Sequence, residues 1–326
     1  MTRRPFLQAS GALAAALLAR DAAAQSAAWK PTRPIRIIVP FAPGGVTDIQ
    51  ARAIAAKMTD SLGSPVIVEN KPGGSSVIGA REVMRAAPDG HTMLYNISTM
   101  VQLPHLYKEP PFDPLKDFTP ITVGAFGGTV LVAHESTPYK TVAELVTFAK
   151  ANPGKIPFAS FGTGSTAHLN IELLKRQAGI DVIHVPYQGS AAAHKDLLGG
   201  QVHLLFDGVT TAITNSKGGR VRMLAAATEA CIPALPDLPT MREAGFDVGI
   251  DGWLAFFGPA GLPQEITDTL QREIAKAVQH PDLKRLIVDG GYALGGISQK
   301  DFIIQVKRNS DQWGKVIREA GIKLEQ

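Results

Sequence analysis

The stretch Ile35-Arg-Ile-Ile-Val39, followed by Pro40-Phe-Ala-Pro-Gly-Gly45, decides the fold of this chain. The first run is short, apolar and β-branched, which is typical of a buried strand. Proline and glycine then end it, and from Asp48 to Leu62 apolar residues recur at helical spacing. The sequence therefore predicts one strand, a glycine-bearing loop and a helix, in that order.

The same unit recurs along the chain after this stretch. A first series contains strands over 66–68 and 92–95 and a helix over 76–86, and we interpret the proline- and aromatic-rich segment 103–120 as a surface excursion. A second series follows, with expected elements at 129–133, 141–150, 157–161, 166–178, 182–185, 190–198, 202–206 and 221–226. The chain then adds a strand over 253–257 and helices over 264–279, 281–288 and 299–320.

Alternating strands and helices indicate an α/β protein of two domains, each a mostly parallel sheet flanked by helices. We expect the chain to cross between the domains near 122–128 and 244–252, which form a hinge. The expected segments are a leader over 1–24, a first domain over 25–125 and 249–326, and a second domain over 126–248.

The first 24 residues have the pattern of a removable signal peptide. Arg3 and Arg4 precede an apolar run from Ala9 to Ala19, which is too short to span a bilayer. Small residues then lead to an expected cleavage site between Ala24 and Gln25. The segment around the two arginines resembles the twin-arginine export pattern, and an ordinary secretory leader is the alternative. Both predict export to the periplasm, with no stable membrane insertion.

Composition excludes several classes of function. The 326 residues carry 33 Lys+Arg and 29 Asp+Glu, and removal of the leader leaves 30 and 28, a net charge of +2. So small a charge argues against a nucleic-acid-binding protein. With one cysteine, Cys231, the chain has neither an intramolecular disulfide nor a multi-cysteine metal site. The common phosphate, dinucleotide, hydrolase and zinc motifs are absent from the sequence, so we expect no cofactor, no metal and no catalysis.

Two loops remain as the chemistry-bearing features. Residues 40–45 and Ser160-Phe-Gly-Thr-Gly-Ser165 each run from a strand into a helix, where backbone N–H groups are free to bind an anion. Neither loop contains Lys or Arg, and hydroxyl groups accompany the second, which favours a carboxylate. Taken alone, either loop is better interpreted as a tight strand–helix connection. Because ligands of open α/β sheets lie at the carboxyl ends of the strands, we expect the two loops to close on one ligand.

Several motifs resemble those of the Bug family of extracytoplasmic solute receptors, which are related to tripartite tricarboxylate transporters. They span nearly the whole mature chain: Pro40-Phe-Ala-Pro-Gly-Gly-Val-Thr-Asp48, Val68-Glu-Asn70, Pro88-Asp-Gly90, Asp113-Pro-Leu-Lys-Asp-Phe118, Phe161-Gly-Thr-Gly-Ser-Thr-Ala-His168, His184-Val-Pro-Tyr187, Asp196-Leu-Leu-Gly-Gly-Gln201 and Leu238-Pro-Thr-Met-Arg-Glu-Ala-Gly245. The resemblance implies a periplasmic binding protein-like fold that closes by a hinge on a small carboxylate. It also implies delivery of that ligand to membrane transporter subunits.

Carried over by residue, the resemblance implies a ligand site with two walls and a far end. The first wall is Phe41, Ala42, Pro43, Gly44, Gly45 and Asp48. The second wall is Ser160, Thr163, Gly164, Ser165, Thr166 and His168. The far end is Ser98, Thr99, Tyr187 and Asp207.

Two other functions are compatible with the sequence. A sensor subunit that reports a metabolite to a membrane kinase would use the same fold. A periplasmic enzyme acting on a carboxylated substrate would use Asp48, His168 and Asp207 as acid and base. We expect a monomeric receptor, and the sequence does not identify the carboxylate.

Overall fold

The computed structural model describes residues 29–323, and from Pro31 onward these residues fall in one compact unit. The leader expected over residues 1–24 and its cleavage after Ala24 lie outside the described residues. Within the described range, the structure contains no helix that combines the length and the apolar character needed to cross a membrane.

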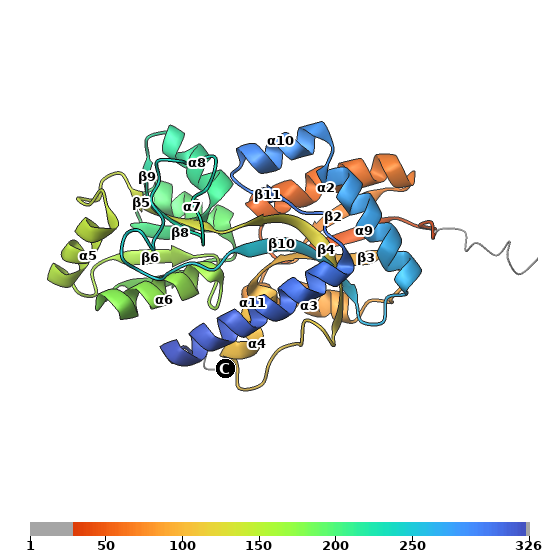
Figure 1. Cartoon of the computed structure of the whole chain (residues 1–326), viewed down its shortest axis with the longest axis horizontal. Coiled ribbons are helices and arrows are strands. Elements are labelled where there is room, and N and C mark those ends of the chain that lie inside the picture. The colour runs from red at the N-terminus through yellow and green to blue at the C-terminus, as the bar shows by residue number, and fades with distance from the viewer. Residues whose placement is uncertain (1–28, 324–326) are drawn as a thin grey trace, which may run out of the picture. The chain divides into compact units, whose positions relative to one another are not determined.

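The first of two sheets has six strands in the order β11-β4-β10-β3-β1-β2. The strands are β1 (Ile35–Val39), β2 (Val66–Asn70), β3 (Thr92–Ile97), β4 (Phe118–Gly127), β10 (Gly252–Pro259) and β11 (Ala293–Leu294). The helices that belong with this sheet are α2 (Val46–Leu62), α3 (Val77–Met84), α4 (Thr99–Leu106), α9 (Gln264–Val278), α10 (Pro281–Asp289) and α11 (Gln299–Ala320), with a short 3-10 turn at Gly74–Ser76. We call this part of the molecule the first lobe (Figure 1).

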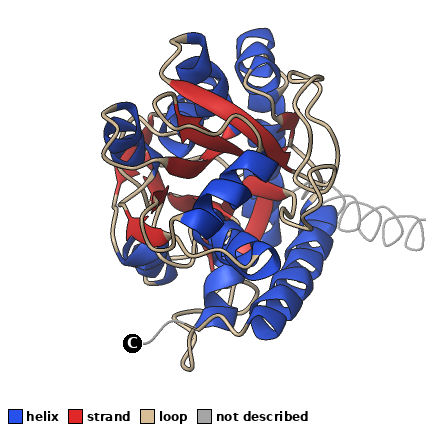
Figure 2. Ribbon diagram, turned by 90° about the vertical axis from the view of Figure 1, so that its left-hand side faces the viewer, coloured by secondary structure: helices blue, strands red, loops and turns tan. Residues whose placement is uncertain are grey.

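The second sheet has five strands in the order β7-β6-β8-β5-β9 and forms the second lobe. Its strands are β5 (Thr129–His134), β6 (Pro157–Ser160), β7 (Ile183–Pro186), β8 (Leu204–Gly208) and β9 (Val221–Ala227). Its helices are α5 (Val142–Ala151), α6 (Thr166–Ala178), α7 (Ser190–Leu198) and α8 (Val209–Lys217). Helices cover the strands from outside in both lobes (Figure 2).

The α/β two-lobe fold is confirmed, and both sheets are mixed, with parallel and antiparallel strand pairs. In the first sheet β1 pairs parallel with β2 and β3, whereas β10 pairs antiparallel with β3 and β4, and β11 antiparallel with β4. In the second sheet β5 is antiparallel to both of its neighbours. The reason lies in the connections: β10 returns from the other lobe and β4 passes into β5 through Gly128 alone, so no crossover helix imposes a parallel direction.

The expected surface excursion at 103–120 is wrong in part. The segment begins inside helix α4, which includes Pro104, and its Phe112 and Phe118 are buried in the core. Apolar side chains of α11, among them Trp313, belong to the same core cluster. Helix α8 was not expected, because its threonine- and serine-rich sequence has low helix propensity. Burial of Val209 and Ala212 stabilises it in the folded protein.

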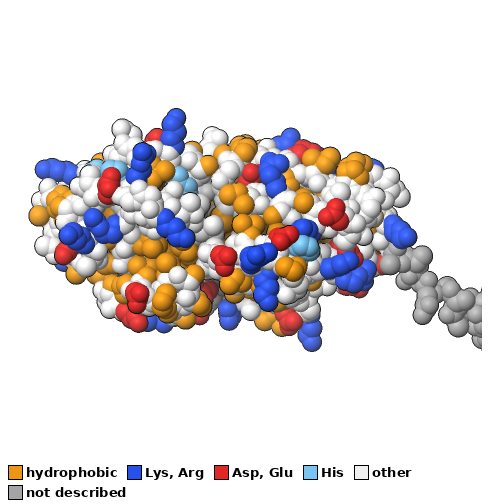
Figure 3. Space-filling model, turned by 90° about the horizontal axis from the view of Figure 1, so that it is seen from above, with side chains coloured by type: hydrophobic (Ala, Val, Ile, Leu, Met, Phe, Trp, Pro, Cys, Tyr) orange, Lys and Arg blue, Asp and Glu red, His pale blue; other side chains and the backbone are white. Residues whose placement is uncertain are grey.

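Charge is evenly distributed on the face seen in Figure 3. Over the described residues visible there, basic and acidic side chains alternate and no continuous basic stripe is present.

The core of the first lobe centres on three aromatic rings. The ring centroid of Phe302, on α11, lies 5.4 Å from that of Trp253 and 5.2 Å from that of Phe257, both on β10. The indole N–H of Trp253 donates to Asn309 Oδ1 at 2.9 Å. These contacts attach the C-terminal helix to the strand that returns from the second lobe.

Replacing Phe302 with alanine should lower the free energy of unfolding by about 3–5 kcal/mol, because Phe302 is fully buried and the change leaves a cavity. Urea denaturation followed by circular dichroism measures the loss. Ile304→Ala on the same helix is the matched control: its side chain is 54% exposed, so the expected change is within about 0.5 kcal/mol. Equal losses for the two variants would contradict this packing.

Candidate functional site

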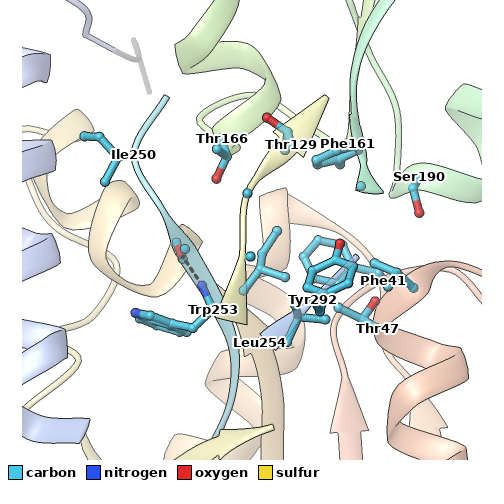
Figure 4. A pocket seen from close by; sticks show the side chains of 17 residues that line it. Phe41, Thr47, Thr129, Phe161, Thr166, Ser190, Ile250, Trp253, Leu254 and Tyr292 are labelled. Atoms are coloured by element: carbon cyan, nitrogen blue, oxygen red, sulfur yellow. Dashed lines mark hydrogen bonds between the residues drawn. The ribbon is translucent and has the colours of Figure 1, made fainter. Parts of the chain in front are cut away.

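A cavity of about 70 Å³ lies between the two lobes (Figure 4). The first lobe contributes Phe41, Val46, Thr47, Ile97, Ser98, Gly127, Gly252, Trp253, Leu254 and Tyr292, and the second contributes Thr129, Phe161, Thr166, Ser190 and Gly208. The connecting residues Gly128 and Ile250 complete the lining. The cavity therefore has walls from both lobes and from both segments that join them.

Four helices begin at the wall of this cavity. Val46 and Thr47 open α2, Thr166 opens α6, Ser190 opens α7, and Gly208 is the N-cap of α8. In α2 and α7 no side chain accepts a hydrogen bond from the first turn, within the part of the chain that is described, whereas Val209 N–H at the start of α8 donates to the Tyr292 hydroxyl. Unpaired N–H groups and the positive ends of helix dipoles together make an anion-binding environment.

The positive character of the cavity does not come from charged side chains. Among the lining residues, all of which are described, Tyr292 is the only one that titrates, and burial raises the pKa of its hydroxyl, so it is neutral. A Cβ built on Gly208 would lie 3.0 Å from the Tyr292 hydroxyl oxygen, which places this hydroxyl at the start of α8. The N-termini of α2 and α7 therefore remain as the groups that face the cavity.

The loop over residues 40–45 is held in place by Asp48. Its carboxylate accepts from Gly44 N at 2.9 Å, from Asn70 Nδ2 at 3.0 Å and from Arg52 at 2.9 Å. Burial by itself would raise the pKa of Asp48, but these hydrogen bonds outweigh it and the pKa is lowered. Asp48 is thus an ionised brace that fixes the loop, and it does not line the cavity.

The same loop contacts the second lobe directly. Ala42 N donates to Gln188 O at 3.3 Å, and a Cβ built on Gly45 would lie 2.6 Å from Ser190 Oγ. Gly45 is the N-cap of α2 and Ser190 is the first residue of α7. The two uncapped helix N-termini therefore meet on one side of the cavity, one from each lobe.

The loop over residues 160–165 is supported by two histidines. Ser160 Oγ lies 2.6 Å from His184 Nε2, and His168 Nδ1 accepts from Gly164 N at 3.0 Å. The two imidazole rings stack with their centroids 4.0 Å apart. Burial lowers the pKa of both His168 and His184 to about 4, so both rings are neutral at physiological pH.

Two hydroxyls of the cavity wall, those of Ser98 and Thr166, already have hydrogen-bond partners. Ser98 Oγ accepts from Trp253 N at 3.3 Å (Figure 4), and Thr166 Oγ1 accepts from Gln102 Nε2 at 2.8 Å. The second of these bonds joins α4 of the first lobe to α6 of the second. By contrast, Thr47 Oγ1 and Ser190 Oγ have no hydrogen-bond partner among the described residues.

A second cavity of about 210 Å³ adjoins the first, and Phe41 and Phe161 line both. Thr163 and Tyr187 belong to its wall, and the Tyr187 hydroxyl donates to Asp196 at 2.7 Å. On the first-lobe side, Ser75 and Ser76 adopt positive φ values of 52° and 83°. This backbone conformation is strained for residues with a Cβ, and the strained segment lies where the lobes meet.

The structure divides the expected site residues into three groups. Those that line the first cavity are Phe41, Ser98 and Thr166. Those that lie in the second cavity or build the two loops are Ala42, Gly44, Gly45, Asp48, Ser160, Thr163, Gly164, Ser165, His168 and Tyr187. Pro43 belongs to the first loop and is exposed, and Thr99 and Asp207 are buried outside both cavities.

The placement of Thr99 and Asp207 follows from their hydrogen bonds. Thr99 Oγ1 lies 3.2 Å from Ser76 Oγ and 3.2 Å from Asn96 Oδ1. Asp207 is fully buried and accepts from Thr211 Oγ1 at 2.6 Å, while His194 Nε2 lies 2.7 Å from the same carboxylate oxygen. The partners of Asp207 are therefore a histidine and a threonine.

Sequence reasoning missed several lining residues. Ser190, Ile250 and Tyr292 lie in segments that carry no glycine loop like the two singled out, and only the folded chain brings them to the cavity. The sequence does contain one indication of Ser190, because the segment that includes Gly189 also connects a strand to a helix.

Comparisons with known proteins identify one family. Residues 50–322 match the model of a family described as tripartite tricarboxylate transporter family receptor. The chain is 36% identical over 300 residues to a protein encoded in the tcbD-tcbE intergenic region of Pseudomonas sp. strain P51, which covers 91% of this chain and 89% of that protein. It is 34% identical to the protein BugT of Bordetella pertussis, over 93% of this chain and 94% of BugT.

Solved structures show the same fold. The periplasmic binding protein BugD superimposes with a TM-score of 0.86 at 32% identity, over 90% of this chain and all of BugD. The R. palustris protein Rpa4515 with adipate gives 0.85 at 33% identity, over 90% of this chain and 99% of that protein. MatC from Rhodopseudomonas palustris with bound malate gives 0.84 at 29% identity, over 88% of this chain and 99% of MatC.

The histidine pair predicts a pH dependence of stability. Below about pH 6.5 the unfolded chain protonates His168, whereas the folded protein keeps it neutral down to about pH 4. The unfolded state then binds more protons, so the free energy of unfolding should fall as the pH falls through this window, by about 1 kcal/mol per pH unit for this group. Urea denaturation at several pH values should show a shallower slope for His168→Gln. An unchanged slope would contradict the assignment.

Proposed function

Because the chain belongs to the tripartite tricarboxylate transporter receptor family, we propose that it captures a small carboxylate between its lobes and delivers it to the membrane subunits of such a transporter. Members of this family are binding receptors, so the chain is a receptor and not an enzyme. The expected acid and base roles of Asp48, His168 and Asp207 accordingly have no place in its function.

The observation that carries the proposal is the meeting of the uncapped N-termini of α2 and α7 at one cavity without any basic side chain. Backbone N–H groups together with the hydroxyls of Thr47 and Ser190 suit a single carboxylate. Closure removes water from the cavity, which strengthens each of these hydrogen bonds. The adipate bound to Rpa4515 and the malate bound to MatC are both carboxylates, which supports the same ligand chemistry here.

We infer export to the periplasm by the leader over residues 1–24, with cleavage after Ala24, and action as a monomer. Domains over 25–125 with 249–326 and over 126–248 would open and close about the connections near Gly128 and Ile250. Both connections line the cavity, so a change in the angle between the lobes acts directly on the ligand site.

A thermal-shift screen of the mature protein against a panel of carboxylates tests the function. A ligand that binds only the folded state raises stability by RT ln(1 + [L]/Kd), or about 2.7 kcal/mol at a hundredfold excess over Kd. We expect a rise in Tm for at least one carboxylate, and none for the corresponding amide at equal concentration. A well-folded protein that responds to no carboxylate would contradict the proposal.

Gly45 and Ser190 allow a sharper test of the carboxylate site. In Gly45→Ala the new Cβ would lie 2.6 Å from the present position of Ser190 Oγ, so the hydroxyl would have to move. Affinity should then fall roughly tenfold, as expected for loss of a hydrogen bond to a charged group. Ser190→Ala should cause a similar loss.

The double variant Gly45→Ala/Ser190→Ala is the control. Without the serine hydroxyl, the nearest atoms to the Cβ added at position 45 would be 4.0 Å away, so the steric clash is removed. It should bind no more weakly than either single variant in isothermal titration calorimetry. Additive losses would show that the two residues do not act through one contact.

A further inference from the structure

The two sides of the ligand cavity differ in the hydrogen bonds they can still make. Thr47 and Ser190, at the starts of α2 and α7, lie on one side, and Ile250 lies on the opposite side (Figure 4). The hydroxyls of Thr47 and Ser190 have no partner among the described residues. The hydroxyls of Ser98 and Thr166 already accept from Trp253 N and Gln102 Nε2. Only one side of the cavity therefore offers a full set of free donors.

The remaining wall is largely apolar. It consists of Phe41, Val46, Ile97, Phe161, Ile250, Trp253, Leu254 and Tyr292, together with glycines and Thr129, whose hydroxyl already accepts from Asn170 Nδ2. Helix α6, which also begins at the wall, has its own cap, because Ser165 Oγ accepts from His168 N. None of the lining residues is Lys, Arg, His, Asp or Glu.

A second ionised group on the ligand would therefore be buried without a counterion. A carboxylate placed against Ile250 and Leu254 would lose its hydration and find only separate neutral donors, the hydroxyl hydrogens of Ser98, Thr129 and Thr166, while an ammonium would find no carboxylate. Single neutral donors suit a carbonyl or hydroxyl oxygen, whereas a carboxylate needs several together. The apolar wall instead gains free energy by covering hydrocarbon.

We propose that the ligand of this receptor carries one carboxylate and an uncharged, mainly apolar body. The carboxylate binds at the starts of α2 and α7, and the body extends across the cavity toward Ile250. This inference rests on the proposed function and narrows its ligand class. It separates this chain from Rpa4515 and MatC, whose bound ligands, adipate and malate, each carry two carboxylates.

Matched pairs of ligands test the proposal by isothermal titration calorimetry on the mature protein near pH 7.5. Hexanoate is compared with adipate, and benzoate with terephthalate, so that each pair differs by one carboxylate. In whichever pair binds more tightly, we expect the affinity for the monocarboxylate to be at least ten times that for the dicarboxylate. Equal or tighter binding of the dicarboxylates would overturn the inference while leaving the receptor function intact. Failure of every carboxylate in the wider panel would overturn the receptor function, and this inference with it.

The variant Ile250→Lys provides a gain-of-function test. A lysine at this position adds a cation to the apolar side, so affinity for the dicarboxylate of a pair should rise at least tenfold while affinity for the monocarboxylate does not. Ile250→Met is the uncharged control and should retain the wild-type preference. If Ile250→Lys does not fold, the ligand pairs on the wild-type protein still decide the question. A folded Ile250→Lys without this change in preference would contradict the placement of the ligand body.

Discussion

The contact between Gly45 and Ser190 is the constraint on which the ligand site depends. It brings the N-terminus of α2, from the first lobe, against the N-terminus of α7, from the second. Two helix dipoles of the same sign repel when nothing lies between them, so the arrangement is best stabilised by an anion. Glycine at position 45 is required because a Cβ would displace the serine hydroxyl. Under the proposed function, ligand binding at this point and closure of the lobes would occur together.

The rest of the structure supports that contact from both sides. Asp48 fixes the first loop through Gly44, Asn70 and Arg52, and the stacked pair His168 and His184 fixes the second. Both supports place polar groups behind the loops and keep charge out of the cavity. The positive potential there consequently comes from the backbone, which cannot move away or exchange protons as a lysine or histidine side chain can.

The connections between the lobes explain how the two halves share one cavity. Strand β4 continues into β5 through Gly128, and β10 returns to the first sheet between β3 and β4. The antiparallel strands that result place Gly127, Gly252 and Leu254 at the cavity wall. The mixed sheets are therefore a consequence of two strands that cross between the lobes, and the same crossing supplies part of the site.

The sequence by itself determined the α/β class, most of the helices and strands, and the two glycine loops, because these depend on local periodicity and on residues with unusual backbone freedom. It also identified Phe41, Ser98 and Thr166, which line the cavity. Only the tertiary structure decided which polar residues face inward: Asp207 is paired with His194 and Thr211, and Ser165 caps its own helix. It alone brought Ile250 and Tyr292 to the wall. Such contacts join residues far apart in the chain, and no local pattern encodes which distant partner a polar side chain will find.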